Sequence, residues 1–283
     1  MAKNNLVPFY KMTGGGNDFV LLDNRKKTLG QDYPALAKKR CERKFSIGAD
    51  GLLVLEESKS LDFRMVYYNS DGSRAEMCGN GARCIARFAH LLKAVPAKMS
   101  FDTDAGALSA EVSDQSVKLK MSPPKDLRLD FPLKLEEGKE IDLSFINTGV
   151  PHAVVLVTDL EKTEVVNLGR AIRYHKEFSP AGTNTNFVTA RDPHHLVVRT
   201  YERGVEDETL ACGTGIVASS LICAAKGMAK SPVSCMTRGG ETMRVYFQAV
   251  EDRRGDSRGA KTVFTEVYLE GPATVCFQGE VEV

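Results

Sequence analysis

Two short segments decide the fold of this chain: Cys78-Gly79-Asn80-Gly81 and Cys212-Gly213-Thr214-Gly215. Each segment follows a tyrosine, Tyr68 ten residues before the first cysteine and Tyr201 eleven residues before the second. Each also precedes an apolar run with helical spacing. The repetition predicts a duplicated chain whose halves carry equivalent cysteine turns.

A second echo lies upstream, where Asn17-Asp18-Phe19-Val20 is similar to Thr185-Asn186-Phe187-Val188. Matched features in the same order indicate an internal repeat. The simplest arrangement is two related domains about a pseudo-twofold axis. Equivalent points of the two halves would then face one shared cleft.

The glycines after each cysteine allow the backbone to bend tightly where a helix begins. A helix N-terminus has unpaired N–H groups and a partial positive charge, which lower the pKa of a thiol below about 8.5 and attract a carboxylate. If two such turns face each other, one thiolate can remove a proton from a carbon while the opposite thiol delivers one. Cys78 and Cys212 are therefore predicted to be the catalytic pair of a two-base racemase or epimerase, and a disulfide between them would be an inactive form.

The composition excludes several other classes of protein. The 283 residues include 38 Lys and Arg against 37 Asp and Glu, so the chain has no electrostatic footprint for nucleic acid or an anionic membrane. No apolar run is long enough for a membrane span, and the N-terminus lacks the apolar core of a signal peptide. Seven cysteines without a CxxC pair predict a cytoplasmic protein with no disulfide framework and no structural zinc.

Alternating apolar patterns predict a strand-rich α+β fold with few helices. The predicted strands are 62–68, 98–103, 108–112, 117–121, 153–157, 186–190, 196–201, 233–237, 242–247, 263–269 and 274–277. The predicted helices are 33–44, 81–93, 164–177 and 215–226. Pro123-Pro124 and the polar stretch to Gly138 indicate a domain boundary, and Glu251–Lys261 is typical of an exposed hairpin loop.

The chain resembles the diaminopimelate epimerases over nearly its whole length. The segments that carry the resemblance are Gly14–Phe19, Gly48–Gly51, Tyr68–Gly72, Met77–Cys84, Asn147–His152, Gly182–Phe187, Tyr201–Gly204, Ala211–Gly215 and Tyr268–Ala273. The resemblance implies two similar α/β domains, each with strands wrapped around a central helix, and an active site in the inter-domain cleft. It places residues 1–122 with 271–283 in the domain of Cys78 and residues 123–270 in the domain of Cys212.

The same resemblance implies conversion of LL-2,6-diaminopimelate to the meso form, in lysine and peptidoglycan-precursor biosynthesis, without cofactor or metal. It also implies a homodimer. It assigns catalysis to Cys78 and Cys212 and tuning of their pKa values to His152 and Glu202. Its substrate contacts are Asn17, Asn69, Gly79, Asn80, Asn184, Glu202, Arg203, Gly213 and Thr214. In chemical terms, Arg203 suits the distal carboxylate of the substrate and Glu202 the distal ammonium.

Some of these residues also have simpler interpretations. Each of three asparagines, Asn69, Asn80 and Asn184, could simply shape a turn, and Glu202 and Arg203 could form a solvated pair. Gly14-Gly15-Gly16 could be a phosphate loop, but the residues that follow are typical of a strand rather than a helix. The other five cysteines are predicted to be small buried hydrophobic residues, and His194 and His195 to be exposed.

Two positions depart from the family pattern. Many members have glutamine where this chain has Gly51, and asparagine where it has Val150. Two side-chain contacts expected around the substrate are therefore missing. The alternative functions are a racemase or epimerase of another amino acid on the same scaffold, and a thiol redox switch without turnover.

Overall fold

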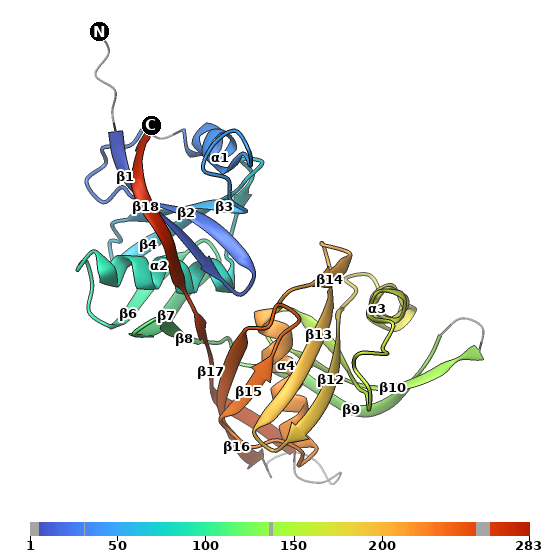
Figure 1. Ribbon diagram of the computed structural model, residues 1–283. Helices are drawn as coiled ribbons and strands as arrows, with labels where there is room; N and C mark the ends of the chain where they lie inside the picture. The colour runs from blue at the N-terminus through green and yellow to red at the C-terminus, as the bar shows by residue number, and fades with distance from the viewer. Residues whose placement is uncertain (1–5, 31, 136–137, 253–260) are drawn as a thin grey trace. The chain divides into compact units, whose positions relative to one another are not determined.

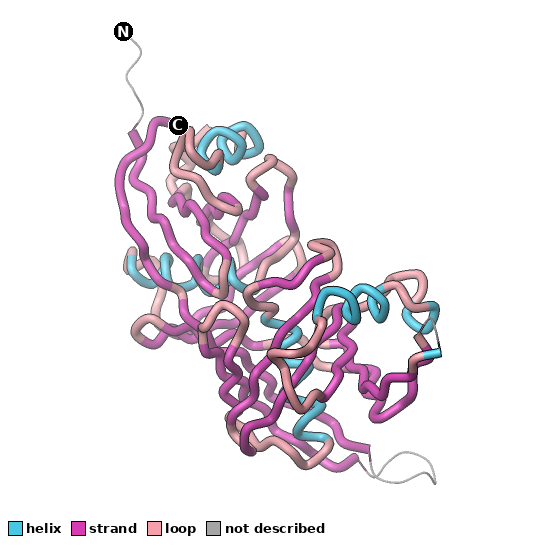
Figure 2. Tube along the Cα trace, turned by 45° about the vertical axis from the view of Figure 1, so that its right-hand side comes forward, coloured by secondary structure: helices cyan, strands magenta, loops and turns pink. Residues whose placement is uncertain are grey.

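A computed structural model describes residues 6–30, 32–135, 138–252 and 261–283. The chain divides into two compact units, here called the first unit (Met1–Leu119 with Gly271–Val283) and the second unit (Lys120–Glu270). In each unit, strands far outnumber helices and wrap around one central helix, α2 or α4 (Figures 1 and 2). This is the α+β architecture that the alternating patterns predicted.

The first unit contains two helices and nine strands in the described residues. They are β1 (Leu6–Gly14), β2 (Asn17–Asp23), α1 (Tyr33–Cys41), β3 (Gly51–Glu56), β4 (Phe63–Asn69), β5 (Arg74–Ala75), α2 (Gly79–Leu91), β6 (Lys98–Thr103), β7 (Gly106–Ser113), β8 (Ser116–Lys120) and, from the C-terminus, β18 (Thr274–Glu282). β18 pairs antiparallel with β1, so the C-terminus returns to the first unit.

The second unit follows the same pattern. Its elements are β9 (Lys125–Lys134), β10 (Glu140–Asn147), β11 (Pro151–Leu156), α3 (Val165–Arg173), a 3₁₀ turn (Lys176–Phe178), β12 (Asn184–Asp192), β13 (His195–Glu202), β14 (Asp207–Thr209), α4 (Gly213–Ala225), β15 (Val233–Met236), β16 (Thr242–Asp252) and β17 (Lys261–Pro272).

Strand pairing confirms the internal repeat and corrects one part of its alignment. β2–β3 and β11–β12 are parallel pairs, and β3–β4 and β12–β13 are antiparallel pairs. β2 is therefore equivalent to β11, and β3 to β12. The predicted echo between Asn17–Val20 and Thr185–Val188 matched β2 with β12, which is wrong by one strand, because short apolar runs after an asparagine occur at more than one strand start.

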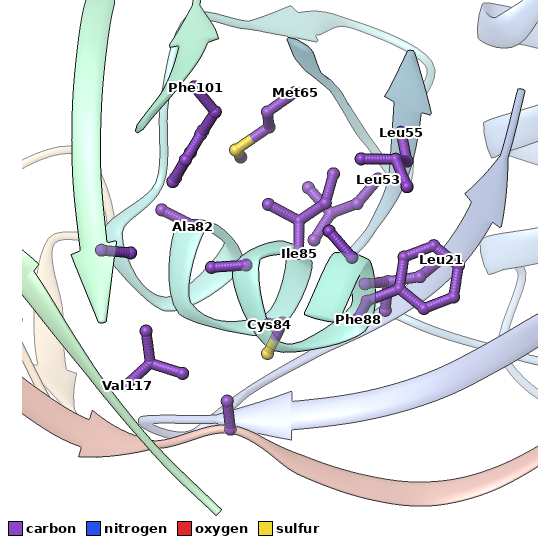
Figure 3. Packing of buried hydrophobic residues seen from close by; sticks show 14 of the residues in the cluster. Leu21, Leu53, Leu55, Met65, Ala82, Cys84, Ile85, Phe88, Phe101 and Val117 are labelled. Carbon is purple, nitrogen blue, oxygen red and sulfur yellow. The ribbon is translucent and has the colours of Figure 1, made fainter. Parts of the chain in front are cut away.

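The central helix of each unit is surrounded by apolar side chains. Around α2, Ile85 and Phe88 pack among Leu53, Met65 and Phe101 (Figure 3). Helix α4 is apolar all round and is buried continuously from Gly215 to Cys223, as expected for a helix enclosed by a sheet. The enclosing strands thus hold the first turn of each central helix in a fixed place.

The four predicted helices are confirmed with shifted ends. Helices α2 and α4 begin two residues earlier than predicted, directly after the cysteines, and α3 ends at Arg173. The interpretation of the stretch up to Gly138 as a boundary segment is wrong from Lys125 onward, because this part forms β9 and pairs with β10. Of the predicted hairpin loop, residues 253–260 lie outside the described residues, and β16 and β17 continue up to them.

Candidate functional site

Cys78 and Cys212 each occupy the residue immediately before a central helix. Both have extended backbones, with φ −142° and ψ 124° at Cys78 and φ −119° and ψ 106° at Cys212. The carbonyl of Cys78 accepts from Ala82 N at 2.7 Å, and that of Cys212 accepts from Ile216 N at 2.9 Å. The N–H groups between each cysteine and these residues therefore precede the first intrahelical bond, as the sequence predicted for an anion-binding helix start.

A chain of hydrogen bonds links the first turn of α2 to the strands beside it. Asn17 Nδ2 donates to Asp50 Oδ2 at 2.9 Å, and Asn80 Nδ2 donates to Asn17 Oδ1 at 2.8 Å. Arg83 Nη2 in turn donates to Asn80 Oδ1 at 2.6 Å, and Arg83 is fully buried. Both amide groups are thus held in one orientation.

Asn80 has little side-chain capacity left for a ligand. Its Nδ2 also donates to Gly15 O at 3.0 Å, so both amide hydrogens are used within the protein. The side chain is only 7% exposed. Asn80 can therefore serve a ligand through its backbone N–H, while its side chain braces the turn between β1 and β2.

Asp50 and Arg83 also belong to this network, although neither was predicted from the sequence to be a site residue. Asp50 accepts from Asn17 and from Arg43 Nη2 at 2.9 Å. Nearby, burial alone would raise the pKa of Asp18, but hydrogen bonds and charges from Arg43 and Lys11 lower it to about 2. The available signal was Arg83 itself, the one charged residue in the first two turns of α2.

Asn69 ends β4, and its Nδ2 donates to Ser73 Oγ at 3.0 Å. The register opposes Asn69 to Gly51, which in turn lies beside Phe19 on β2. Since Asn17 begins β2, Gly51 begins β3 and Asn69 ends β4, the three positions lie at the same edge of the sheet. Five predicted site residues belong to the first unit: Asn17, Asn69, Cys78, Gly79 and Asn80.

The pKa of Cys212 differs from the prediction. Burial and, to a smaller extent, the negative charge of Glu202 raise it to about 12. The Thr214 hydroxyl, 3.6 Å from the sulfur, and the backbone N–H groups of Thr214 and Gly215 lower it, but by less. The expectation of a lowered pKa is therefore wrong for Cys212 in this state, because the helix start is enclosed. At neutral pH this sulfur is a thiol and can donate a proton.

Glu202 ends β13, Arg203 follows it directly, and both residues are half-buried. Burial raises the pKa of Glu202, and Thr209 Oγ1 donates to its Oε2 at 2.9 Å. Arg203 Nη1 donates to Ala181 O at 3.0 Å, but its guanidinium has no acidic partner among the described residues. A cation held in place without a counter-ion can bind a carboxylate.

Asn184 begins β12 and is buried. Its Nδ2 donates to Pro151 O at 3.2 Å, and its Oδ1 accepts from the backbone N of Arg203 at 2.8 Å. It therefore connects the start of β11, the start of β12 and the end of β13. The contact with Asn184 holds the backbone of Arg203 beside the start of β12.

His152 is fully buried on β11, and burial together with the charge of Arg203 lowers its pKa to about 3. Asn186 Nδ2 donates to its Nδ1 at 3.1 Å, so the imidazole proton belongs on Nε2. Nε2 is buried and has no partner in the described residues. His152 is thus a neutral group, and its tautomer is set by Asn186, which was not predicted from the sequence to be a site residue.

All seven cysteines are free. Four of the five predicted as buried are buried, namely Cys41, Cys84, Cys223 and Cys235. The prediction is wrong for Cys276, which is exposed on β18, a strand that pairs with β1 alone in the described part of the chain. His194 and His195 are exposed, as predicted.

The described parts of the chain hold no group of three or more His, Cys, Asp or Glu residues placed to bind a metal ion. Within the same residues, no helix is both long and apolar enough to cross a membrane.

Solved structures share this fold. A Bacillus anthracis phenazine biosynthesis protein of the PhzF family matches with a TM-score of 0.71 at 15% identity, covering 99% of this chain and 100% of that protein. A hydroxyproline epimerase from Agrobacterium vitis matches with a TM-score of 0.63 at 17% identity, covering 100% of this chain and 94% of that protein. The repeated units and these likenesses define the class: a two-domain α/β fold shared by PhzF proteins and hydroxyproline epimerase.

Sequence comparison narrows this class to one family. The diaminopimelate epimerase family model matches residues 9–126 and 144–253. The diaminopimelate epimerase of Aquifex aeolicus is 42% identical, covering 97% of this chain and 98% of that protein. That of Chlorobaculum tepidum is 41% identical, covering 95% and 99%. The chain belongs to the diaminopimelate epimerase family.

Proposed function

We propose that the protein epimerises LL-2,6-diaminopimelate to meso-diaminopimelate, with Cys78 and Cys212 as its two acid–base groups. The observation that carries the proposal is the repeated placement of these cysteines directly before the central helices of the two units. Membership in the family supports diaminopimelate as the substrate.

In this mechanism one cysteine, as thiolate, takes the proton from the α-carbon. The electron pair moves toward the substrate carboxylate, where the free N–H groups and positive ends of helices α2 and α4 stabilise the charge. The opposite cysteine, as thiol, gives a proton to the other face of the carbon, which inverts it. Because burial keeps Cys212 protonated at neutral pH, we assign proton donation in the resting protein to Cys212.

The remaining residues bind and orient the substrate. Backbone N–H groups of Gly79, Asn80, Gly213 and Thr214 would hold the reacting carboxylate. Arg203, which has no acidic partner in the described residues, would bind the distal carboxylate.

Glu202 would bind the distal ammonium, and its charge acts on the pKa of Cys212. Asn17, Asn69 and Asn184 would fix the amino-acid groups as neutral donors and acceptors. His152 would influence the cysteines as a neutral imidazole.

The wider assignments are part of the same proposal. The product is the meso compound used for lysine and peptidoglycan precursors. We propose that the enzyme works in the cytoplasm as a homodimer, on a small amino-acid substrate, without nucleic-acid or membrane partners.

Proton NMR in D₂O with reduced protein tests the function. We expect loss of the α-proton signal of LL-diaminopimelate together with formation of the meso isomer. Cys78→Ala and Cys212→Ala should abolish epimerisation, while Cys276→Ala, at an exposed cysteine on β18, should match the wild type. Absence of exchange by the reduced wild-type protein would overturn the proposal, and normal turnover by either alanine variant would overturn the two-base mechanism.

A further inference from the structure

The side chains of β4 that face α2 change from apolar to polar along the strand. Along β4, alternate side chains face α2: Phe63 and Met65 are buried in the cluster around this helix, and Tyr67 packs against the same cluster half-buried. Asn69, the next residue on this face, ends the strand. Tyr67 therefore lies between the apolar core and the polar edge of the candidate site.

The ring of Tyr67 lies across Gly51, at the start of the neighbouring strand. A Cβ atom at Gly51 would be 2.5 Å from Cε2 of Tyr67 and 2.6 Å from the carbonyl oxygen of Tyr68. Gly51 does not have a positive φ, so its backbone conformation does not require glycine. The lack of a side chain at residue 51 makes room for the tyrosine ring.

The internal repeat shows which residues of the second unit correspond to Gly51 and Tyr67. Leu52 pairs with Tyr68 in the first unit, and Thr185 pairs with Tyr201 in the second. Stepping one residue along each strand makes Gly51 equivalent to Asn184 and Tyr67 equivalent to Thr200. In the second unit, the polar side chain of Asn184 is combined with the short side chain of Thr200. In the first unit, Gly51 has no side chain and is combined with the long side chain of Tyr67, which ends in a hydroxyl.

The phenol of Tyr67 is held in place but makes no hydrogen bond within the described residues. Its ring packs edge-on against Phe19, with centroids 6.0 Å apart and an interplanar angle of 79°. The hydroxyl is also not among the buried unpaired polar atoms, so solvent reaches it. Burial raises the pKa of Tyr67, and negative charge on Cys78 raises it further, so the phenol remains a donor when Cys78 is a thiolate.

We propose that the Tyr67 hydroxyl is a substrate-binding group of the Cys78 half of the site, donating a hydrogen bond to a carboxylate oxygen of the amino-acid substrate. It supplies the polar contact that Gly51 cannot make. This inference rests on the proposed epimerase function.

Tyr67→Phe tests the inference, because it removes the hydroxyl and keeps the ring over Gly51. The matched control is Tyr10→Phe: Tyr10 packs against the same core cluster, edge-on to Phe88 at 5.1 Å, and also makes no hydrogen bond within the described residues. Rates of α-proton exchange and epimerisation of diaminopimelate would be measured over a range of substrate concentrations, with thermal unfolding in parallel.

We expect Tyr67→Phe to lower kcat/KM about 10- to 100-fold, the loss typical of a hydrogen bond to a charged group, with an unchanged melting temperature. Tyr10→Phe should match the wild type in both measurements. If the wild type is active and the two variants behave alike, or if Tyr67→Phe loses activity only in proportion to a lowered melting temperature, the inference is overturned and the proposed function stands. If the reduced wild type is inactive on diaminopimelate, the proposed function fails and the inference fails with it.

Discussion

The stability of the second unit should fall at mildly acidic pH because of His152. This imidazole is fully buried, and its pKa is lowered from 6.5 to about 3. In the unfolded chain it binds a proton below about pH 6.5, whereas in the folded unit it stays neutral until about pH 3. Between these values the unfolded state holds more protons, so the stabilising contribution is complete above pH 6.5 and is lost as the pH falls.

The size of this effect follows from the two pKa values. Each pH unit below 6.5 costs about 1.4 kcal/mol until the folded-state pKa is reached. Lowering the pH from 7 to 4.5 therefore costs the second unit about 3 kcal/mol through this residue alone. His152→Asn removes the titration and keeps an acceptor near the position that Asn186 donates to.

The assay is urea unfolding at pH 7, 5.5 and 4.5. Unfolding is monitored by hydrogen exchange in peptides from β11 and β12, so that the free energy of unfolding is obtained for the second unit by itself. The wild type should lose about 3 kcal/mol more than His152→Asn between pH 7 and 4.5. Any constant cost of the substitution cancels in this difference. Parallel stability curves, or an imidazole that titrates near pH 6.5 in ¹⁵N NMR of the folded protein, would refute the reasoning.

Two further predictions concern the cysteine turns and the strand edge. Cys212, with a pKa raised from 9.0 to about 12, should react with iodoacetamide at pH 7 about 30-fold more slowly than an ordinary thiol. The higher pKa makes the Cys212 thiolate about 1000-fold scarcer, and the greater nucleophilicity of this more basic thiolate offsets part of that loss. Peptide mass spectrometry against the exposed Cys276 measures this, and equal labelling rates would contradict it. Gly51→Ala should destabilise the first unit by about 1–3 kcal/mol in urea unfolding, because its Cβ would meet the Tyr67 ring and a backbone carbonyl. Gly30→Ala, which would meet nothing within 4 Å, is the control, and an equal effect of both substitutions would exclude the proposed close contact.

The secondary structure could be predicted where one face of an element is buried and the other is not. Strand β3 was missed because Leu52–Leu55 is buried on both faces, and a continuous apolar run has no period that identifies a strand. Strand β9 was missed for the opposite reason: among the strands that the structure describes it pairs with β10 alone, as an edge strand does, so its charged residues and Pro132 are tolerated.

The candidate site was predictable in its residue types but not in its supporting contacts. The cysteine turns stand out because glycine spacing and helix polarity are local properties. The hydrogen bond from Arg83 to Asn80 spans one turn of α2 and is a local contact, whereas the hydrogen bond from Asn186 to His152 joins residues 34 positions apart, and neither of these two residues carries a local signal for the contact.

By itself, the sequence determined the duplication, the two helices that begin after a cysteine, and the family, since each depends on residue order and spacing. Only the tertiary structure decided that Cys212 is a thiol rather than a thiolate and that His152 is neutral. Only the strand register brought Tyr67 across Gly51. The reason is physical. A pKa depends on how completely the surrounding chain excludes water, and the contact of Tyr67 with Gly51 depends on the register of β3 against β4. Neither the exclusion of water nor the register is established before the sheet closes around its helix.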